Sequence, residues 1–131
     1  MLLTDEMPSS RILVVEDDAL LRESLYSVLD YAGYEVITAR HGLDGLNVLR
    51  DTDAMPDLIL SDMCMDEMNG YQFLTALRAE SQWQTIPFVF LSGRLELDAD
   101  SDVLQGLGVA DYVTKPFPMQ TLLTAVQRAI S

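Results

Sequence analysis

Cysteine is nearly absent from this chain of 131 residues, in which Cys64 is the single one. An internal disulfide is therefore excluded, and a reducing compartment such as the cytoplasm is the expected location. The N-terminal segment MLLTDEMPSS lacks the basic and long apolar regions of a signal peptide. No apolar run approaches the roughly 18 residues that are needed to cross a bilayer. We therefore expect a soluble cytoplasmic protein that does not enter a membrane.

Basic residues are also scarce, because 8 Lys and Arg face 21 Asp and Glu and leave a formal net charge of −13. A surface of this sign repels polyanions, so direct binding to nucleic acid or to an anionic membrane is disfavoured. Hydrophobic residues make up 49% of the chain and charged residues 22%, a balance that is too apolar for intrinsic disorder. A chain of this length is typical of one domain with its own core.

Short apolar runs alternate with segments of helical periodicity along most of the chain. The apolar runs predict five strands, at residues 12–15, 34–39, 58–61, 88–91 and 110–114. The periodic segments predict five helices, near residues 21–32, 43–49, 71–77, 103–107 and 119–130. Such alternation requires right-handed crossovers, and continuous apolar runs are typical of a parallel sheet covered on both faces. We therefore expect a doubly wound α/β domain over residues 11–131, preceded by a flexible leader at residues 1–10.

Polar side chains follow four of the predicted strands at the point where each strand ends. Glu16 and Asp17 follow the first strand, Asp62 the third, Ser92 the fourth and Lys115 the fifth. The carboxyl ends of the strands in a doubly wound sheet face one crevice. The sequence therefore predicts that these side chains converge.

The chemistry of this set favours a metal-assisted phosphoryl transfer. Clustered carboxylates resist ionising together unless a cation is present, so the set implies a hard divalent metal ion. Mg²⁺ commonly takes one or two carboxylates, several waters and a phosphate oxygen, which matches these residues better than a Ca²⁺ cage made of protein ligands alone. A carboxylate beside such a metal can attack phosphorus, while Lys115 and Ser92 can bind the oxygens of the transferred group. Asp62 is the best candidate for the nucleophile.

Five segments of the sequence carry a resemblance to a known family. The segments ILVVEDD, PDLILSD, MDEMNG, PFVFLSG and YVTKPF resemble, in order and spacing, the successive motifs of response regulator receiver domains, the CheY-like family of two-component and phosphorelay signalling. The resemblance covers residues 11–131. It implies a flavodoxin-like fold with the strand order 2-1-3-4-5.

The resemblance also implies a role for each acidic residue. Asp62 is the phosphoacceptor, and its phosphoryl group comes from a phosphohistidine of a sensor histidine kinase or of a histidine phosphotransfer protein. Asp17, Asp62 and the backbone carbonyl of Cys64 bind Mg²⁺ directly, while Glu16 binds it through a water molecule. The domain is not a conventional enzyme, since it catalyses only its own aspartyl phosphorylation and dephosphorylation.

The remaining motif residues are implied to read out the phosphorylated state. Ser92 hydrogen-bonds the phosphoryl group, Lys115 neutralises it, the bond from Lys115 to Pro116 is cis, and Tyr112 is the aromatic switch residue. The signal then passes through the surface of the fourth helix, fifth strand and fifth helix to a downstream protein or effector domain. Two interpretations of the chain remain open: it is a stand-alone regulator, or it is a receiver cut from a longer protein.

Three residues depart from the usual pattern of the family. Glu16 stands where Asp is commoner, which keeps the charge but changes the water geometry at the metal. Asp66 stands where Pro is usual, and Asn69 where Asp usually precedes Gly70. Asp66 frees the loop and adds a negative charge beside the phosphorylation site, so these departures leave the lifetime of the phosphoryl group open.

Other classes of function fit the residues less well. The main alternative is a degenerate receiver that binds partners without phosphorylation, and retention of Asp17, Asp62, Ser92 and Lys115 argues against it. A phosphatase of the haloacid dehalogenase type needs a second Asp two residues after the nucleophile, where this chain has Cys64. A flavin- or nucleotide-binding module on this fold needs a phosphate loop rich in Gly, Ser or Thr after the first strand, which this sequence lacks.

Overall fold

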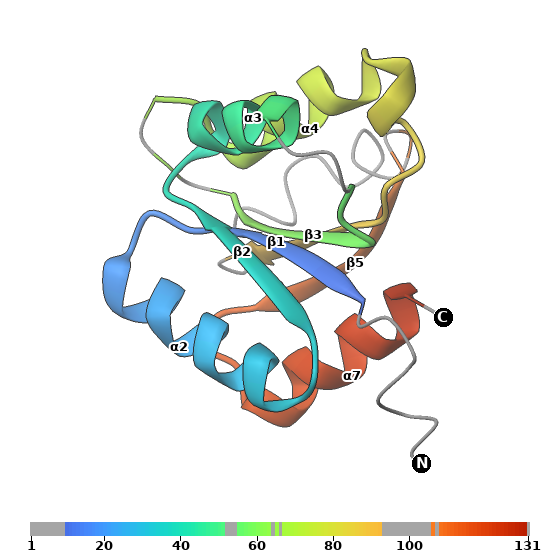
Figure 1. Cartoon of the computed structure of the whole chain (residues 1–131). Helices are drawn as coiled ribbons and strands as arrows, with labels where there is room; N and C mark the ends of the chain where they lie inside the picture. The colour runs from blue at the N-terminus through green and yellow to red at the C-terminus, as the bar shows by residue number, and fades with distance from the viewer. Residues whose placement is uncertain are drawn as a thin grey trace.

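A five-stranded parallel sheet forms the centre of the protein in a computed structural model that describes residues 10–51, 55–63, 65, 67–92, 106 and 108–130 (Figure 1). The strand order is β2-β1-β3-β4-β5, which confirms the predicted flavodoxin-like topology. The strands are β1 (Arg11–Val15), β2 (Glu35–Ala39), β3 (Leu58–Asp62), β4 (Phe88–Ser92) and β5 (Val109–Thr114).

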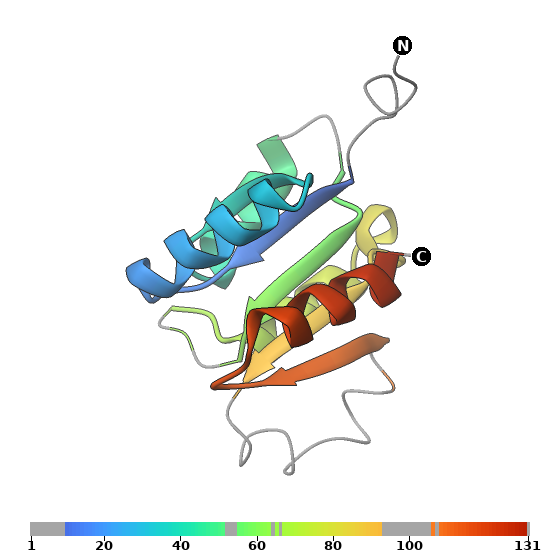
Figure 2. The same ribbon diagram turned by 90° about the horizontal axis from the view of Figure 1, so that it is seen from below.

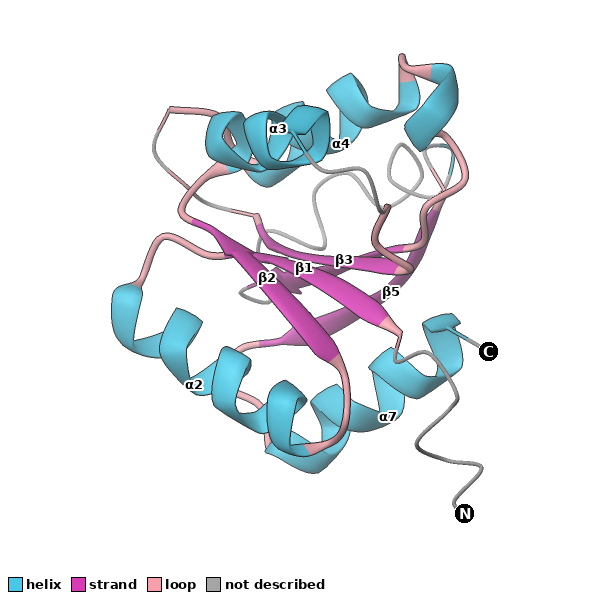
Figure 3. Ribbon diagram, viewed as in Figure 1, coloured by secondary structure: helices cyan, strands magenta, loops and turns pink. Residues whose placement is uncertain are grey.

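Helices cover both faces of the sheet, as Figure 3 shows. The helices in the described residues are α2 (Ala19–Tyr31), α3 (Gly42–Asp51), α4 (Gly70–Arg78), α7 (Met119–Ile130) and the short 3-10 helix η1 (Ser81–Trp83). Helices α2 and α7 lie on one face, and α3 and α4 lie on the other. The helix predicted near residues 103–107 and the leader predicted at residues 1–10 fall almost entirely outside the described residues. None of the helices in the described part of the chain is long and apolar enough to cross a membrane.

Alternate residues of each strand enter opposite layers of the core. In β1, Ile12 and Val14 pack in the layer that α2 and α7 cover, whereas Leu13 and Val15 pack in the layer that α3 and α4 cover. All four side chains are fully buried, which explains why the run is continuously apolar. Trp83 of η1, an element that the sequence did not predict, is also buried in the layer of α3 and α4.

The register of the sheet aligns the carboxyl ends of the strands. Val15 pairs with Ser61, Asp62 pairs with Leu91, and Ser92 pairs with Thr114. Figure 2 shows the arrowheads of the strands pointing to the same side of the molecule. The residues that follow β1, β3 and β5 are therefore brought to one edge, as the sequence predicted.

Two helices that begin at this edge are capped by acceptor side chains. Asp18 Oδ1 accepts hydrogen bonds from the backbone N–H groups of Leu20 and Leu21, at 3.0 and 3.2 Å. Asn69 forms a capping box at the start of α4, in which its Oδ1 accepts from the N–H of Gln72 and its own N–H donates to Gln72 Oε1. Asn69, a departure from the usual pattern of the family, is thus a good helix cap.

The substitution Asn69→Ala is expected to lower the free energy of unfolding by about 1 kcal/mol, because the N–H of Gln72 loses its acceptor. Asn69→Asp is the matched control and should stay within a few tenths of a kcal/mol of the wild type, since Asp caps equally well and favours the helix N-terminus. Urea denaturation measures both variants. Equal midpoints for wild type and Asn69→Ala would contradict a stabilising role for the cap.

Candidate functional site

Three carboxylates and one ammonium group meet at the carboxyl edge of the sheet. Oxygen atoms of Glu16, Asp17 and Asp62 lie within 4.8 Å of one another. Lys115 Nζ lies 3.2 Å from Glu16 Oε1 and 3.1 Å from Asp62 Oδ1. Glu16 and Asp62 are only 1% and 7% exposed, whereas Asp17 is exposed. The structure thus brings together four of the residues that the sequence predicted for one site.

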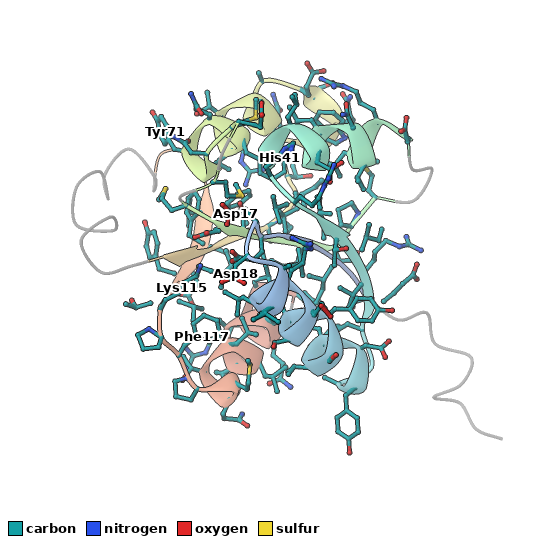
Figure 4. The ribbon with its side chains drawn as sticks, turned by 90° about the vertical axis from the view of Figure 1, so that its left-hand side faces the viewer. Asp17, Asp18, His41, Tyr71, Lys115 and Phe117 are labelled. Carbon is teal, nitrogen blue, oxygen red and sulfur yellow. The ribbon has the colours of Figure 1, made fainter. Side chains whose placement is uncertain are left out.

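The site lies between elements from both layers of helices. Figure 4 shows Asp17 and Lys115 close together, with His41 and Tyr71 on one side and Phe117 on the other. His41 directly precedes α3, Tyr71 lies in the first turn of α4, and Phe117 lies between β5 and α7. In this view the acidic cluster is thus flanked by residues that follow β2, β3 and β5 in the sequence.

Glu16 is held at every polar group. Its backbone N–H donates to Ala39 O at 3.1 Å, and its backbone carbonyl accepts from Arg22 Nη1 at 2.8 Å. Its Oε2 accepts from the N–H of Asp18 at 3.1 Å, while Oε1 accepts from Lys115. Sequence reasoning missed Arg22, because the reach of a long side chain back past the start of its helix leaves no local pattern.

Asp62 is fixed by its strand and by the loop that follows it. Strand β3 is paired on both sides, by β1 and β4, so the backbone of Asp62 lies in the middle of the sheet. The N–H of Gly70 donates to Met63 O at 2.9 Å, which closes the loop between them. Gly70 packs so closely that a side chain there would collide with the carbonyl oxygen of Asp62.

Burial controls the ionisation of the two inner carboxyl groups. It raises the pKa of Glu16 from 4.5 to about 7, and the charge of Asp62 adds to this rise, while the N–H of Asp18 and the ammonium group of Lys115 oppose it. Burial likewise raises the pKa of Asp62, against the lowering effect of Lys115. Burial also acts to lower the pKa of Lys115, but the charges of Glu16 and Asp62 outweigh it and raise that pKa. Lys115 therefore stays protonated near neutral pH.

The donor set fits a hard divalent cation. Three carboxylates face one ammonium group, so the site holds more negative charge than Lys115 neutralises. Asp17 is exposed, which leaves room for water ligands on that side. A few carboxylates together with several waters are the coordination that Mg²⁺ prefers. The predicted backbone ligand, Cys64, lies outside the described residues, as does Asp66.

The predicted switch residues lie on the two strands at one side of the sheet. Ser92 ends β4, and its side chain lies outside what the structure describes. Tyr112 lies in β5, where its buried hydroxyl group has no hydrogen-bond partner among the described residues. Burial raises the pKa of Tyr112, and the charge of Asp111 adds to the rise. The peptide bond from Lys115 to Pro116 is cis, as the resemblance implied.

Comparison with known proteins decides the family. A family model described as the response regulator receiver domain matches residues 12–127. The chain belongs to this family. It is therefore a receiver domain, and receiver domains are signalling domains of two-component systems. The match confirms the resemblance that the sequence motifs carried.

Individual relatives agree with this assignment. The receiver domain is 40% identical over 126 residues to the phosphate regulon transcriptional regulatory protein PhoB of Escherichia coli, a match that covers 92% of this chain and 53% of PhoB. The structure of the chemotaxis response regulator CheY4 of Vibrio cholerae superposes with a TM-score of 0.84 at 31% identity, covering 93% of this chain and 99% of that one. The chain spans about half, or less, of the length of the curated relatives it matches.

A third relative bears on the metal. The receiver domain of the sensor histidine kinase PA1611 from Pseudomonas aeruginosa superposes with a TM-score of 0.81 at 26% identity, covering 94% of this chain and 98% of that one. That structure is described as having a magnesium ion coordinated in the active site cleft. In the present structure, which has the same fold, the acidic cluster of Glu16, Asp17 and Asp62 lies at the carboxyl edge of the sheet.

Proposed function

We propose that Asp62 accepts a phosphoryl group from a phosphohistidine of a sensor histidine kinase or of a histidine phosphotransfer protein. The observation that carries the proposal is the position of Lys115, which lies 3.2 Å from Glu16 and 3.1 Å from Asp62 in a cluster completed by Asp17. An ammonium group at this position can neutralise an oxyanion that forms on Asp62. Membership of a family in which PhoB and CheY4 are found supports the same assignment.

The transfer is a displacement at phosphorus. A carboxylate oxygen of Asp62 forms the new O–P bond while the N–P bond of the phosphohistidine breaks, and the electron pair of that bond stays on the imidazole nitrogen. Lys115 moves from the carboxylates to the phosphoryl oxygens, and the hydroxyl group of Ser92 donates to one of them. Apart from transfer to and from its own Asp62, the domain performs no chemistry.

The metal-binding residues are proposed from the donor set. Asp17, Asp62 and the backbone carbonyl of Cys64 would hold Mg²⁺, with Glu16 bound through a water molecule. Bound Mg²⁺ supplies positive charge that offsets the repulsion between the phosphoryl oxygens and the attacking carboxylate. The magnesium-bound receiver domain of PA1611 supports this choice of ion.

Phosphorylation is proposed to act on partners through the side of the domain formed by β5 and α7, together with the predicted helix near residues 103–107. Tyr112 lies in β5, and its unpaired buried hydroxyl group leaves this ring without a polar anchor among the described residues. Movement of Ser92 toward the phosphoryl group would free space for Tyr112 to turn. The partner is a downstream protein or effector domain, and a net charge of −13 disfavours direct contact with nucleic acid or membrane. The cytoplasmic location stays a prediction.

Incubation with acetyl phosphate and Mg²⁺ tests this function. The wild type is expected to gain one phosphoryl group, measured by intact-protein mass spectrometry, because a nucleophilic carboxylate lies beside a metal site and an ammonium group. Asp62→Asn should gain none, and EDTA should prevent the reaction. Asp51→Asn, at the exposed end of α3, is the matched control and should react like the wild type.

Two outcomes would contradict the assignment. Modification of Asp62→Asn at the rate of the wild type would place the acceptor elsewhere, and an equal rate in EDTA would remove the metal from the reaction. A folded wild type that stays unmodified under all conditions would favour the alternative of a receiver that binds partners without phosphorylation.

A further inference from the structure

We propose that Arg22 is a positioning residue, whose guanidinium group fixes the peptide between Glu16 and Asp17 and thereby aims the Asp17 carboxylate at the metal site. This inference rests on the proposed function, because it concerns the same Mg²⁺ site. It adds a basic residue of α2 to a site for which the sequence predicted only residues that follow the strands.

The geometry links Arg22 to the backbone of the acidic turn. Arg22 is the fourth residue of α2, and its side chain reaches back past the start of the helix. Its Nη1 donates to the carbonyl oxygen of Glu16 at 2.8 Å, in a half-buried hydrogen bond. The carbonyl group of Glu16 and the N and Cα atoms of Asp17 belong to one planar peptide unit. A hydrogen bond that fixes the carbonyl oxygen therefore also fixes the position of the Asp17 Cα atom.

Asp17 depends on its backbone more than the other carboxylates do. Glu16 is held by Lys115 and by the N–H of Asp18, and Asp62 is held by Lys115. The Asp17 carboxylate is exposed and, among the residues that the structure describes, takes part in no hydrogen bond. No side chain in the described part of the chain therefore sets its direction, and we infer that the orientation of the turn determines where the Asp17 carboxylate can reach.

The rest of the turn is anchored at its two ends. The N–H of Glu16 donates to Ala39 O, and Asp18 caps α2 through its side chain. Between these anchors the bond from Arg22 is the one hydrogen bond made to the peptide plane before Asp17, among the described residues. Loss of that bond frees rotation of this plane while leaving the strand and the helix in place.

An effect of the Arg22 charge and a positioning effect of Arg22 predict opposite changes in the affinity for Mg²⁺ when Arg22 is replaced. The positioning role can therefore be tested. A guanidinium group near a cation site repels Mg²⁺, so its removal should tighten Mg²⁺ binding if charge alone mattered. If Arg22 acts by positioning, its removal should weaken binding, because groups that orient metal ligands commonly change affinity by 10–100-fold. The sign of the change separates the two.

Isothermal titration with Mg²⁺ at constant ionic strength measures this sign on the whole chain. Arg22→Gln is expected to raise the Kd for Mg²⁺ roughly tenfold, and Arg22→Lys, which can still donate to the Glu16 carbonyl, should recover most of the affinity. Arg50→Gln removes the same charge from the exposed last turn of α3 and should leave the Kd unchanged. In the metal-free protein, ¹⁵N relaxation should show a more mobile backbone at Asp17 in Arg22→Gln than in the wild type, and Arg22→Lys should restore the mobility of the wild type.

Each result decides between the roles. An unchanged or lower Kd in Arg22→Gln overturns the proposal, even if the variant melts at a lower temperature, because a merely structural arginine changes stability alone. A wild type that binds no Mg²⁺ overturns the proposed metal site itself. If Arg22→Gln does not fold, Arg22→Met keeps the apolar stem and, like Gln, removes the charge together with the guanidinium donor, so the same Kd comparison applies.

Discussion

The substitution Gly70→Ala is expected to lower the free energy of unfolding by about 3 kcal/mol, at the upper end of what overpacking normally costs. A Cβ atom at Gly70 would collide with the carbonyl oxygen of Asp62 and would lie 2.7 Å from Phe90 Cε1 and 3.0 Å from Met63 Cα. Two of these three neighbours are backbone atoms, so a rotamer change cannot relieve the contact. The strain falls on the strand end that carries Asp62.

Urea denaturation of Gly70→Ala, with Gly106→Ala as the control, measures this effect. A Cβ atom at Gly106 meets nothing within 4 Å, so that variant should be as stable as the wild type or slightly more stable. Gly70→Ala should also react more slowly with acetyl phosphate, because relief of the clash moves Asp62. A Gly70→Ala protein with the stability of the wild type would show that this close approach is not a constraint.

The metal-free protein is expected to lose stability as pH rises from about 4.5 to about 7.5, by on the order of 2–3 kcal/mol relative to the variant Glu16→Gln. Burial raises the pKa of Glu16 from 4.5 to about 7, so the folded state binds more protons than the unfolded state between these values. Stability then falls as pH rises through the folded-state pKa and levels off above it. The raised pKa of Asp62 acts in the same direction.

Thermal melts in EDTA across this pH range provide the measurement. Glu16→Gln removes the titrating group, whereas Glu80→Gln changes an exposed glutamate whose side chain makes no cap hydrogen bond and should keep the slope of the wild type. Millimolar Mg²⁺ should stabilise the wild type most at the high end of the range, where the carboxylates are ionised. Parallel pH profiles for wild type and Glu16→Gln would disprove the link between Glu16 burial and stability.

The sequence predicted the strands to within one residue at each end, because a run that is buried on both faces is continuously apolar. The carboxyl edge also followed from the sequence, since parallel strands must end together. The pairing order came from the motifs of the family and not from periodicity, because alternation of strands and helices does not say which strands are neighbours.

Other features depend on atoms that no local pattern records. The hydrogen bond from Arg22 to the Glu16 carbonyl requires a particular side-chain conformation, and the pKa of Glu16 depends on how completely neighbouring elements exclude water. Asn69 illustrates a different limit. The sequence indicates only that its departure from the family's Asp leaves the lifetime of the phosphoryl group open, whereas the structure shows a complete capping box, because an amide oxygen accepts from a helix N-terminus as well as a carboxylate does.

The buried position of Trp83 gives this receiver domain an internal optical reporter. Trp83 is the single tryptophan of the chain, it is 2% exposed, and its indole N–H has no hydrogen-bond partner among the described residues. It belongs to the same core layer on which Met63 and Tyr112 pack. An indole shielded from water emits at shorter wavelength than a solvated one. The fluorescence of the unlabelled protein therefore reports changes in the packing of this core layer, against which both Met63, after Asp62, and Tyr112, in β5, lie.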